Sequence, residues 1–260
     1  MQVLKFAEWI LSAPAWLQGL TEGMQRFFFQ LYQTFIYQDR WKFFTNGLEV
    51  TFMVTIGALL IGVVIGMLVG ILRSTHDSYV NKKPPLLLRV ANAICSVYLT
   101  VIRGTPMMVQ LLIMGFVIMV PKSQQMTILC AILTLGINSG AYVAEIARSG
   151  IMSVSQGQTE AGRSLGLTYA QTMRYIVIPQ AFKNILPALG NEMIILLKDT
   201  SLVTVIALQD VTKAAQVVVS KTYTATVPYL SLAAIYLVLV MILTKLLRIL
   251  ERRLRKSDRR

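Results

Sequence analysis

The chain has 260 residues, of which 55% are hydrophobic and only 14% are charged, and its formal net charge is +13. This balance excludes an ordinary water-soluble globular protein, because too few polar side chains remain to cover so many apolar ones. Nucleic-acid binding is disfavoured as well. The basic residues stand beside apolar segments instead of along one polar face, a placement that fits attraction to anionic lipid.

Residues 1–41 form the first segment and are rich in aromatic side chains, among them Trp9, Trp16 and residues 27–29. They lack the basic start, the short apolar stretch and the cleavage site of a secretory signal, so we expect them to be retained. Such aromatic density is typical of helices at the boundary between water and lipid. We predict an extracytoplasmic, interfacial segment formed by an extra lipid-side helix; a lid or a partner-docking element is the alternative.

Long apolar stretches follow, and at about 1.5 Å per residue a helix of some twenty residues crosses a hydrocarbon core of about 30 Å. Three stretches are continuous: residues 50–72, 126–144 and 222–244. Two are interrupted by polar residues: 90–120 is cut at 103–106, and 184–208 is cut at 198–201. The sequence therefore predicts an all-α integral membrane protein with five transmembrane helices.

Lys and Arg are concentrated in residues 73–89, in residues 148–183 and in the tail from Lys245 onward. Basic connections stay in the cytoplasm, and these three regions alternate correctly with five spans. We therefore predict that the N-terminus lies outside and the C-terminus inside, with residues 251–260 forming a basic cytoplasmic tail.

Signatures of an enzyme are missing from the sequence. A Walker phosphate loop would need two glycines, a lysine and a serine or threonine at fixed spacing, and no such string occurs. The single histidine, His76, excludes a helical zinc pair and leaves little scope for a histidine-based triad. Cys95 and Cys130 lie in apolar spans, where we interpret them as packing residues. We expect no catalytic residue, metal ion or cofactor in this chain.

Charged side chains within the interrupted spans point to function, because a charge inside the bilayer is costly unless it faces partner groups or a cavity. Pro106 removes a backbone donor and Gly104 loosens the helix, so we expect a discontinuous span there. Transporters use such breaks to direct helix-end groups at a substrate, and Arg103 would attract a carboxylate. The alternative is a structural ion pair between Arg103 and an acidic residue of another span.

The second interruption places Lys198 beside Asp199 and two hydroxyl residues. These opposite charges either neutralise each other or line a polar path, and the structural interpretation is slightly favoured. Glu49, Glu145 and Glu192 stand near the ends of predicted spans, where a carboxylate can reach water, and we interpret them as solvated or salt-bridged boundary residues. Glu145 also has Arg148 three residues later on the same helical face.

Gly62, Gly66 and Gly70 repeat every four residues in the first span. They leave a smooth strip on which another helix can approach closely. We interpret the strip as a packing feature, with a dimer face as the alternative.

The long connection between the third and fourth spans contains a predicted short helix at about residues 157–168. Gly166 is expected to end it, and Pro179 to mark a second turn before the next span. Ala161 and Gly162 give one face of this helix only small residues. A helix with such a face outside the membrane is expected to bind in a groove of a partner protein.

This connection resembles the cytoplasmic signature of the permease subunits of ATP-binding-cassette (ABC) importers, which reads Glu-Ala-Ala, three residues, Gly, nine residues, Ile, one residue, Leu, Pro. The matching residues are Glu160, Ala161, Gly166, Ile176 and Pro179. The departures are Gly162 and Ile178, where the family usually has Ala and Leu; Gly in place of Ala lowers helix propensity by about 1 kcal/mol. The spacing is intact throughout.

The resemblance extends over about residues 45–250, to the branch of the family that imports polar amino acids. The shared motifs are Arg-Gly-Thr-Pro with a following Gln (103–106 and Gln110), Asn-Ser-Gly-Ala-Tyr (138–142), Glu145 with Arg148, and Leu-Lys-Asp-Thr-Ser-Leu (197–202). Residues 1–40 do not resemble the usual short start of the family.

The resemblance implies a type I ABC importer permease fold for residues 42–250, placed in the cytoplasmic membrane of a prokaryote, and ATP-driven alternating access that carries a polar amino acid. It implies as partners a cytoplasmic ABC ATPase that holds ATP and Mg, a second permease chain and an extracytoplasmic amino-acid-binding protein. The implied coupling residues are Glu160, Ala161, Gly162, Gly166, Ile176 and Pro179. Location and charge add a hypothetical substrate site: Arg103, Gly104, Thr105, Asn138, Glu145, Asp199 and Thr200.

Two other classes of function compete with this one. A secondary transporter driven by an ion gradient would not need the small-faced cytoplasmic helix. A non-transporting membrane scaffold or signalling anchor would leave the broken, charged spans unexplained. The sequence leaves open which amino acid is carried, and whether the permease dimer contains two identical chains or two related ones.

Overall fold

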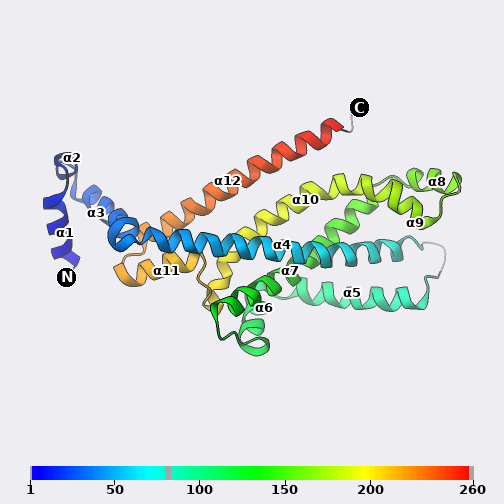
Figure 1. The fold of residues 1–260 in the computed structure, drawn as a ribbon, viewed down its shortest axis with the longest axis horizontal. Helices are drawn as coiled ribbons and strands as arrows, with labels where there is room; N and C mark the ends of the chain where they lie inside the picture. Colours follow the sequence, from blue (N-terminus) through cyan, green and yellow to red (C-terminus); the bar gives the residue numbers. More distant parts are fainter. Residues whose placement is uncertain (1, 80–82, 258–260) are drawn as a thin grey trace. The chain divides into compact units, whose positions relative to one another are not determined.

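Helices are the regular elements of the parts of the chain that the computed structural model describes, residues 2–79 and 83–257 (Figure 1). The chain divides into two compact units. The first comprises Met1–Thr51 and Gln209–Leu239, and the second comprises Phe52–Leu208 and Val240–Arg260. Two long helices, α4 (Trp41–Asp77) and α12 (Thr226–Ser257), contribute residues to both units.

The first unit begins with three short helices, α1 (Gln2–Ser12), α2 (Ala15–Gln18) and α3 (Glu22–Leu31), followed by the π-helix η1 (Tyr32–Ile36) and the 3-10 turn η2 (Tyr37–Asp39). The expectation of one extra helix was wrong, because Pro14 and the turn before Glu22 interrupt the segment. Its aromatic rings pack on one another: the ring of Trp9 lies 5.3 Å from that of Phe29 and 5.8 Å from that of Tyr32. The interfacial location of this segment stays a prediction.

The core of the first unit joins the start of α4 to α11 (Val211–Thr222) and to the first half of α12. Asp210 is fully buried and caps α11, because its carboxylate accepts hydrogen bonds from the backbone N–H groups of Thr212 and Lys213. A Cβ atom at Gly47 would lie 2.7 Å from the carbonyl oxygen of Asp210. Only a residue without a side chain lets α4 approach the cap of α11 so closely.

The second unit contains the remaining elements. They are, in chain order, α5 (Leu86–Gly104), α6 (Met107–Ile113), the π-helix η3 (Met114–Ile118), α7 (Gln124–Met152), α8 (Gln156–Ser164), α9 (Tyr169–Thr172), the π-helix η4 (Met173–Val177), α10 (Ile178–Asp199) and the 3-10 helix η5 (Thr200–Ile206). Helix α7 packs against both α5 and α10, and its fourteen buried residues are more than any other described helix of this unit contributes. It is therefore the central helix on which the others are arranged.

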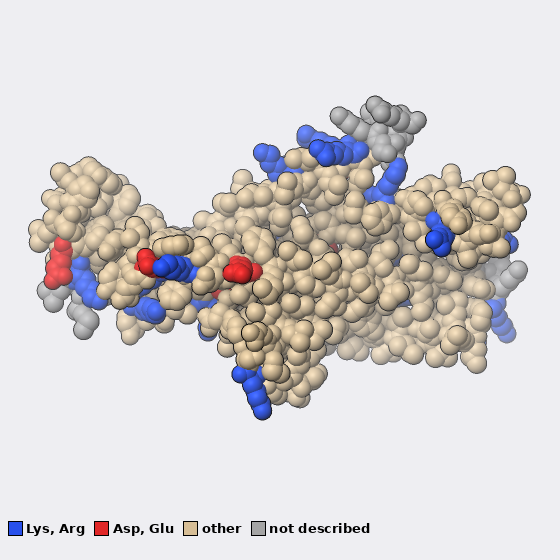
Figure 2. Space-filling view, in the orientation of Figure 1, with Lys and Arg blue, Asp and Glu red and all other residues tan. Residues whose placement is uncertain are grey.

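Among the described residues, four helices are long and apolar enough to cross a membrane: α4, α5, α7 and residues 226–254 of α12. A fifth span results if Tyr169–Ile206 and Val211–Thr222 are counted as one broken pair. On that count the predicted all-α architecture with five spans is confirmed. The face drawn in Figure 2 is mostly uncharged, with Lys and Arg gathered in separate small groups, as expected for a surface in lipid. The orientation of the termini stays a prediction.

The expected break at residues 103–106 is confirmed. Helix α5 ends at Gly104, Thr105 is extended at φ −115° and ψ 142°, and α6 begins after Pro106. Proline disfavours a helical conformation in the residue before it and has no N–H to donate, so the helix must stop here.

The expected break at residues 198–201 was misplaced. Helix α10 runs to Asp199 and continues as the 3-10 helix η5, because none of these four residues removes a backbone donor. The chain leaves the helix only at Ala207, which has a left-handed φ of 60°. Pro179 was also misread as a second turn, since it lies in the first turn of α10, where proline is tolerated.

The last helix differs from its predicted bounds at both ends. Tyr223 takes a left-handed φ of 53° and ends α11, so α12 begins at Thr226 instead of residue 222. The predicted tail at residues 251–260 is helical as far as Ser257, and residues 258–260 lie outside the described part of the chain.

The glycine strip of α4 packs against α7 within the second unit, which confirms the packing interpretation. A Cβ atom at Gly66 would lie 2.4 Å from Cβ of Val143 and 2.9 Å from the backbone nitrogen of Ala144. One turn further along α4, a Cβ atom at Gly70 would lie 2.6 Å from Cβ of Ala147. The two backbones thus approach more closely than any side chain would allow.

We expect Gly66→Ala to lower the thermal unfolding midpoint of the purified protein, with a destabilisation of about 1–3 kcal/mol from overpacking, because a backbone atom of Ala144 cannot move aside. Gly23→Ala in α3 is the matched control, since its added Cβ meets nothing within 4 Å. A Gly66→Ala protein that melts with the wild type would show that α4 and α7 are not in close contact.

Candidate functional site

The break between α5 and α6 is held by the side chain of Gln110. Its amide nitrogen donates to the carbonyl oxygen of Ile102 at 2.8 Å and to Oγ1 of Thr105 at 2.8 Å. Its amide oxygen accepts a hydrogen bond from Nδ2 of Asn138 at 2.9 Å. One side chain of α6 therefore satisfies a carbonyl group freed by the break and ties the break to α7.

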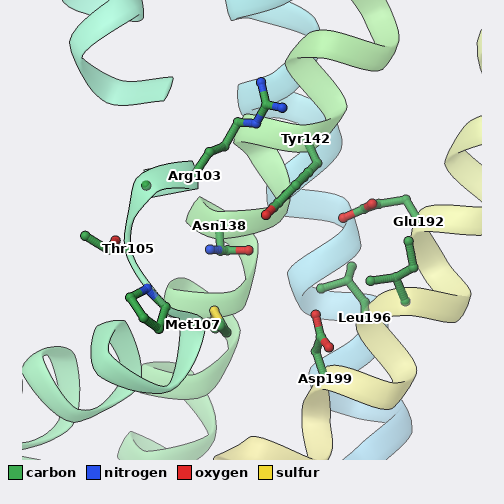
Figure 3. A pocket seen from close by; sticks show the side chains of 11 residues that line it. Arg103, Thr105, Met107, Asn138, Tyr142, Glu192, Leu196 and Asp199 are labelled. Atoms are coloured by element: carbon green, nitrogen blue, oxygen red, sulfur yellow. The ribbon is translucent and has the colours of Figure 1, made fainter. Parts of the chain in front are cut away.

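A cavity of about 540 Å³ lies between this break and helices α7 and α10 (Figure 3). We call it the central cavity. Its lining residues are Arg103, Gly104, Thr105, Pro106, Met107, Asn138, Tyr142, Glu192, Ile195, Leu196 and Asp199. Five of the seven predicted substrate residues, Arg103, Gly104, Thr105, Asn138 and Asp199, thus surround one space although they come from three separate parts of the chain.

The charges of the central cavity are divided between its two sides. Arg103 stands at the end of α5 with its side chain 45% exposed and its guanidinium carbon 5.6 Å from the centre of the Tyr142 ring. Glu192 and Asp199 are both on α10 and line the opposite side of the cavity (Figure 3). Glu192 is buried and accepts a 2.7 Å hydrogen bond from the hydroxyl of Ser139. The cavity can thus hold a solute with an anionic group at one end and a cationic group at the other.

Sequence reasoning missed Glu192, Tyr142 and Met107 as lining residues of this cavity. The prediction that Glu192 is a boundary residue near a span end was wrong, because Glu192 is buried within α10. The sequence did indicate that Glu192 shares a helix face with Asp199, because the two residues are seven positions apart and two helical turns bring them to the same face of α10.

Two predicted substrate residues do not line the central cavity. Thr200 is fully buried, and its hydroxyl donates to the carbonyl oxygen of Leu197 at 2.7 Å. Glu145 lies one turn beyond Tyr142 and has three arginine neighbours. Its Oε1 atom is 3.7 Å from both Arg103 and Arg73, and its Oε2 atom is 3.9 Å from Arg148.

These contacts agree with two interpretations drawn from the sequence. Arg103 approaches Glu145, an acidic residue of another span, as expected if Arg103 forms a structural ion pair. Arg148 and Glu145 form the expected contact within α7. Arg103 also lines the central cavity, and its side chain is 45% exposed, so its guanidinium group is accessible to a carboxylate other than that of Glu145.

The predicted cytoplasmic helix exists as α8 but is shorter than expected, ending at Ser164. Gly166 ends it with a left-handed φ of 84°. The N–H of Gly166 donates to the carbonyl of Arg163, and the N–H of Leu167 donates to that of Gly162, which together form a Schellman motif. The expectation that Gly166 stops the helix is therefore confirmed.

The small face of α8 is used inside the chain. Gly162 is buried, and a Cβ atom there would lie 2.8 Å from both Cδ1 of Ile176 and Cγ2 of Thr172. The expectation that Gly162 faces a partner was wrong for this reason, and the same contact explains why glycine replaces the usual alanine. Glu160 and Ala161 are exposed on α8, and Pro179 is exposed at the start of α10.

We expect Gln110→Leu to lower the thermal unfolding midpoint of the purified protein. The carbonyl of Ile102 and the amide of Asn138 would each lose a hydrogen-bond partner, and each unsatisfied group costs about 1–3 kcal/mol of stability. Leu has nearly the same size, so the change tests the hydrogen bonds and not the volume. Gln125→Leu, an exposed position on α7, is the control. Equal midpoints for the two variants would contradict a stabilising role of Gln110.

Residues 87–256 match the family model described as the inner membrane component of binding-protein-dependent transport systems. The chain is 36% identical over 212 residues to the glutamine transport system permease protein GlnP of Escherichia coli (strain K12), covering 81% of this chain and 92% of the relative. It is 36% identical over 218 residues to the arginine transport system permease protein ArtQ of Bacillus subtilis (strain 168), covering 83% and 94%.

Solved structures agree with these relatives. A crystal structure of an amino acid ABC transporter with histidines superposes with a TM-score of 0.71 at 42% identity, covering 82% of this chain and 94% of the other. The inward-facing MetNI methionine ABC transporter superposes with a TM-score of 0.69 at 19% identity, covering 84% and 98%, which supports the fold alone. The chain therefore belongs to the inner membrane components of binding-protein-dependent transport systems, the multi-pass permease subunits of ABC importers.

Proposed function

We propose that this permease imports a polar amino acid through the central cavity. The observation that carries the proposal is the division of charge in that cavity, with Arg103 on one side and the carboxyl groups of Glu192 and Asp199 on the other. An amino acid presents a carboxylate and an ammonium group, so its two charges match the two sides of the cavity. The names of two relatives, glutamine and arginine permeases, support the same class of substrate.

The polar atoms around the cavity suggest how the substrate is oriented. Its carboxylate pairs with the guanidinium of Arg103 and lies beside Gly104, whose missing side chain leaves the backbone open: an added Cβ would meet nothing within 4 Å. The ammonium group faces Asp199 or Glu192, and Asn138 offers a neutral polar contact. Because two carboxyl groups face one guanidinium, a basic side chain is accommodated as well as a neutral one.

The energy for transport comes, in this proposal, from a separate ABC ATPase that binds ATP and Mg and contacts α8. The exposed positions of Glu160 and Ala161 support this docking surface, and Leu165 adds an apolar side chain that is 81% exposed at the end of α8. Gly162 and Ile176 contribute indirectly, because their contact fixes α8 to the helix that leads into α10.

A second permease chain and an extracytoplasmic binding protein complete the proposed importer. The binding protein delivers the amino acid, and closure of the ATPases on ATP alternates the access of the central cavity between the two sides of the membrane. ATP and Mg are held by the partner, and the chain itself supplies the path.

We expect Arg103→Gln to reduce the affinity of the reconstituted importer for its amino acid at least about tenfold, because the carboxylate loses its charged partner. Arg103→Lys should retain part of the affinity, since an ammonium group keeps the charge but not the bidentate geometry. Binding of radiolabelled L-glutamine and L-arginine to the purified complex measures both variants. Wild-type affinity in Arg103→Gln would remove Arg103 from the substrate site.

We expect Glu160→Arg to prevent co-purification of the ATPase or to lower coupled ATP hydrolysis at least about tenfold, because reversing a charge at the centre of a docking surface opposes association. Glu22→Arg on α3 is the control, a charge reversal at another exposed position. An intact, active complex carrying Glu160→Arg would move the docking surface away from α8.

A further inference from the structure

A second cavity, of about 470 Å³, adjoins the central one and shares Arg103, Gly104 and Tyr142 with it. We call it the arginine cavity. Its other lining residues are Arg73, Ser96, Leu99, Thr100 and Glu145. The lining residues come from α4, α5 and α7, all within the second unit, and the Arg103 side chain forms part of the wall between the two spaces.

The charged groups around the arginine cavity do not balance. Within the described part of the chain, the ion pairs of Arg73, Arg103 and Arg148 involve two carboxyl groups, those of Glu145 and Asp77. Arg148 is paired with Asp77, because its Nε donates to that carboxylate at 2.8 Å. Arg73 and Arg103 share the single atom Oε1 of Glu145 at 3.7 Å each, well beyond the ~2.7–2.9 Å of a charge-assisted hydrogen bond. One positive charge is left over, and both guanidinium groups keep donors available.

Arg73 has a buried hydrogen-bond donor that is unsatisfied among the described residues. Its Nε atom is buried and has no hydrogen-bond partner among the described residues, while its side chain is still 23% exposed. The hydroxyl residues Ser96 and Thr100 line the same cavity. A carboxylate would satisfy this arrangement, because its two oxygens match the planar donor fork of a guanidinium group.

The arginine cavity lies on the predicted cytoplasmic side of the central cavity. Along α5 its lining residues run from Arg103 back to Ser96, toward the start of that helix. Along α7 they run from Tyr142 forward to Glu145, toward the end of that helix, and α4 contributes Arg73 near its last turn. These three helix ends belong to the connections at 73–89 and after Met152, where Lys and Arg are concentrated.

We propose that the arginine cavity is a second binding station for the carboxylate of the transported amino acid, occupied after it leaves the central cavity and before release. Arg103 borders both spaces and passes the carboxylate to Arg73. Glu145 is the resident counter-ion that holds the two arginines in position while the station is empty. This inference rests on the proposed function, because it adds a step to the same transport path.

The first test compares variants of Arg73 in the complete importer, with its ATPase and binding protein reconstituted into liposomes. We expect Arg73→Gln to slow uptake of radiolabelled L-glutamine or L-arginine at least about tenfold while equilibrium binding changes less than about twofold, because the central cavity is intact. Arg73→Lys should restore part of the uptake. Arg89→Gln is the matched control, an exposed arginine of α5 outside both linings.

The second test needs no variant and uses acetate as the probe. Phenylglyoxal modifies accessible arginines, and mass spectrometry reports each one in the purified wild-type complex. Acetate should slow modification of Arg73 at least about threefold relative to sodium chloride at the same ionic strength, while modification of Arg89 is unchanged. This readout is independent of which amino acid is transported.

The outcomes separate this inference from the proposed function. Normal uptake by Arg73→Gln, or modification of Arg73 that acetate does not slow, would overturn the second station. Arg103→Gln that still binds and transports both amino acids normally would overturn the substrate site of the central cavity instead. Loss of binding together with uptake in Arg73→Gln would assign Arg73 to the central site and also overturn the station.

Discussion

The hydrogen bonds of Gln110 across the break between α5 and α6 are the interaction on which the central cavity depends. Inside a bilayer no water compensates a backbone carbonyl left free by a broken helix, and Pro106 ensures that the helix is broken. Gln110 supplies the missing donor to Ile102 and, through its amide oxygen, ties the break to Asn138 of α7. The break is thereby stable enough to place Arg103 at the wall of a cavity in the second unit.

Helix α7 extends this arrangement to its neighbours through polar contacts that small residues make possible. The hydroxyl of Tyr98 donates to the carbonyl of Ile137 at 2.6 Å and connects α5, while Ser139 connects α10 through Glu192. Gly140 lies directly beneath the hydroxyl of Tyr98, where a Cβ atom would be 2.8 Å away. Hydrogen bonds between apolar helices fix the rotation of each helix about its axis as well as the distance between the helices. Apolar contacts alone are not directional and leave that rotation less defined.

The construction of α8 links an exposed surface to the same helices. Its inner face is closed by Gly162 against Ile176 and Thr172, and Gln158 of α8 accepts a hydrogen bond from Gln180 of α10 at 3.2 Å. From Tyr169 the chain stays helical through α9, η4 and α10 to Asp199. Helix α8 therefore contacts, through Gly162 and Gln158, the helical run that carries Asp199 of the central cavity, which is the mechanical connection that the proposed coupling requires.

Features governed by neighbouring residues could be read from the sequence alone: the apolar spans, the break before Pro106 and the helix end at Gly166. Each follows from local backbone chemistry or from composition, which do not need a partner helix. The directions of side chains could not be read in this way. These directions depend on how each helix is rotated against its neighbours. They decide that Glu192 faces the cavity, that Glu145 approaches Arg103 and that Gly162 packs inside the chain. Only the tertiary packing fixes that rotation, since it is set by contacts between residues far apart in the chain.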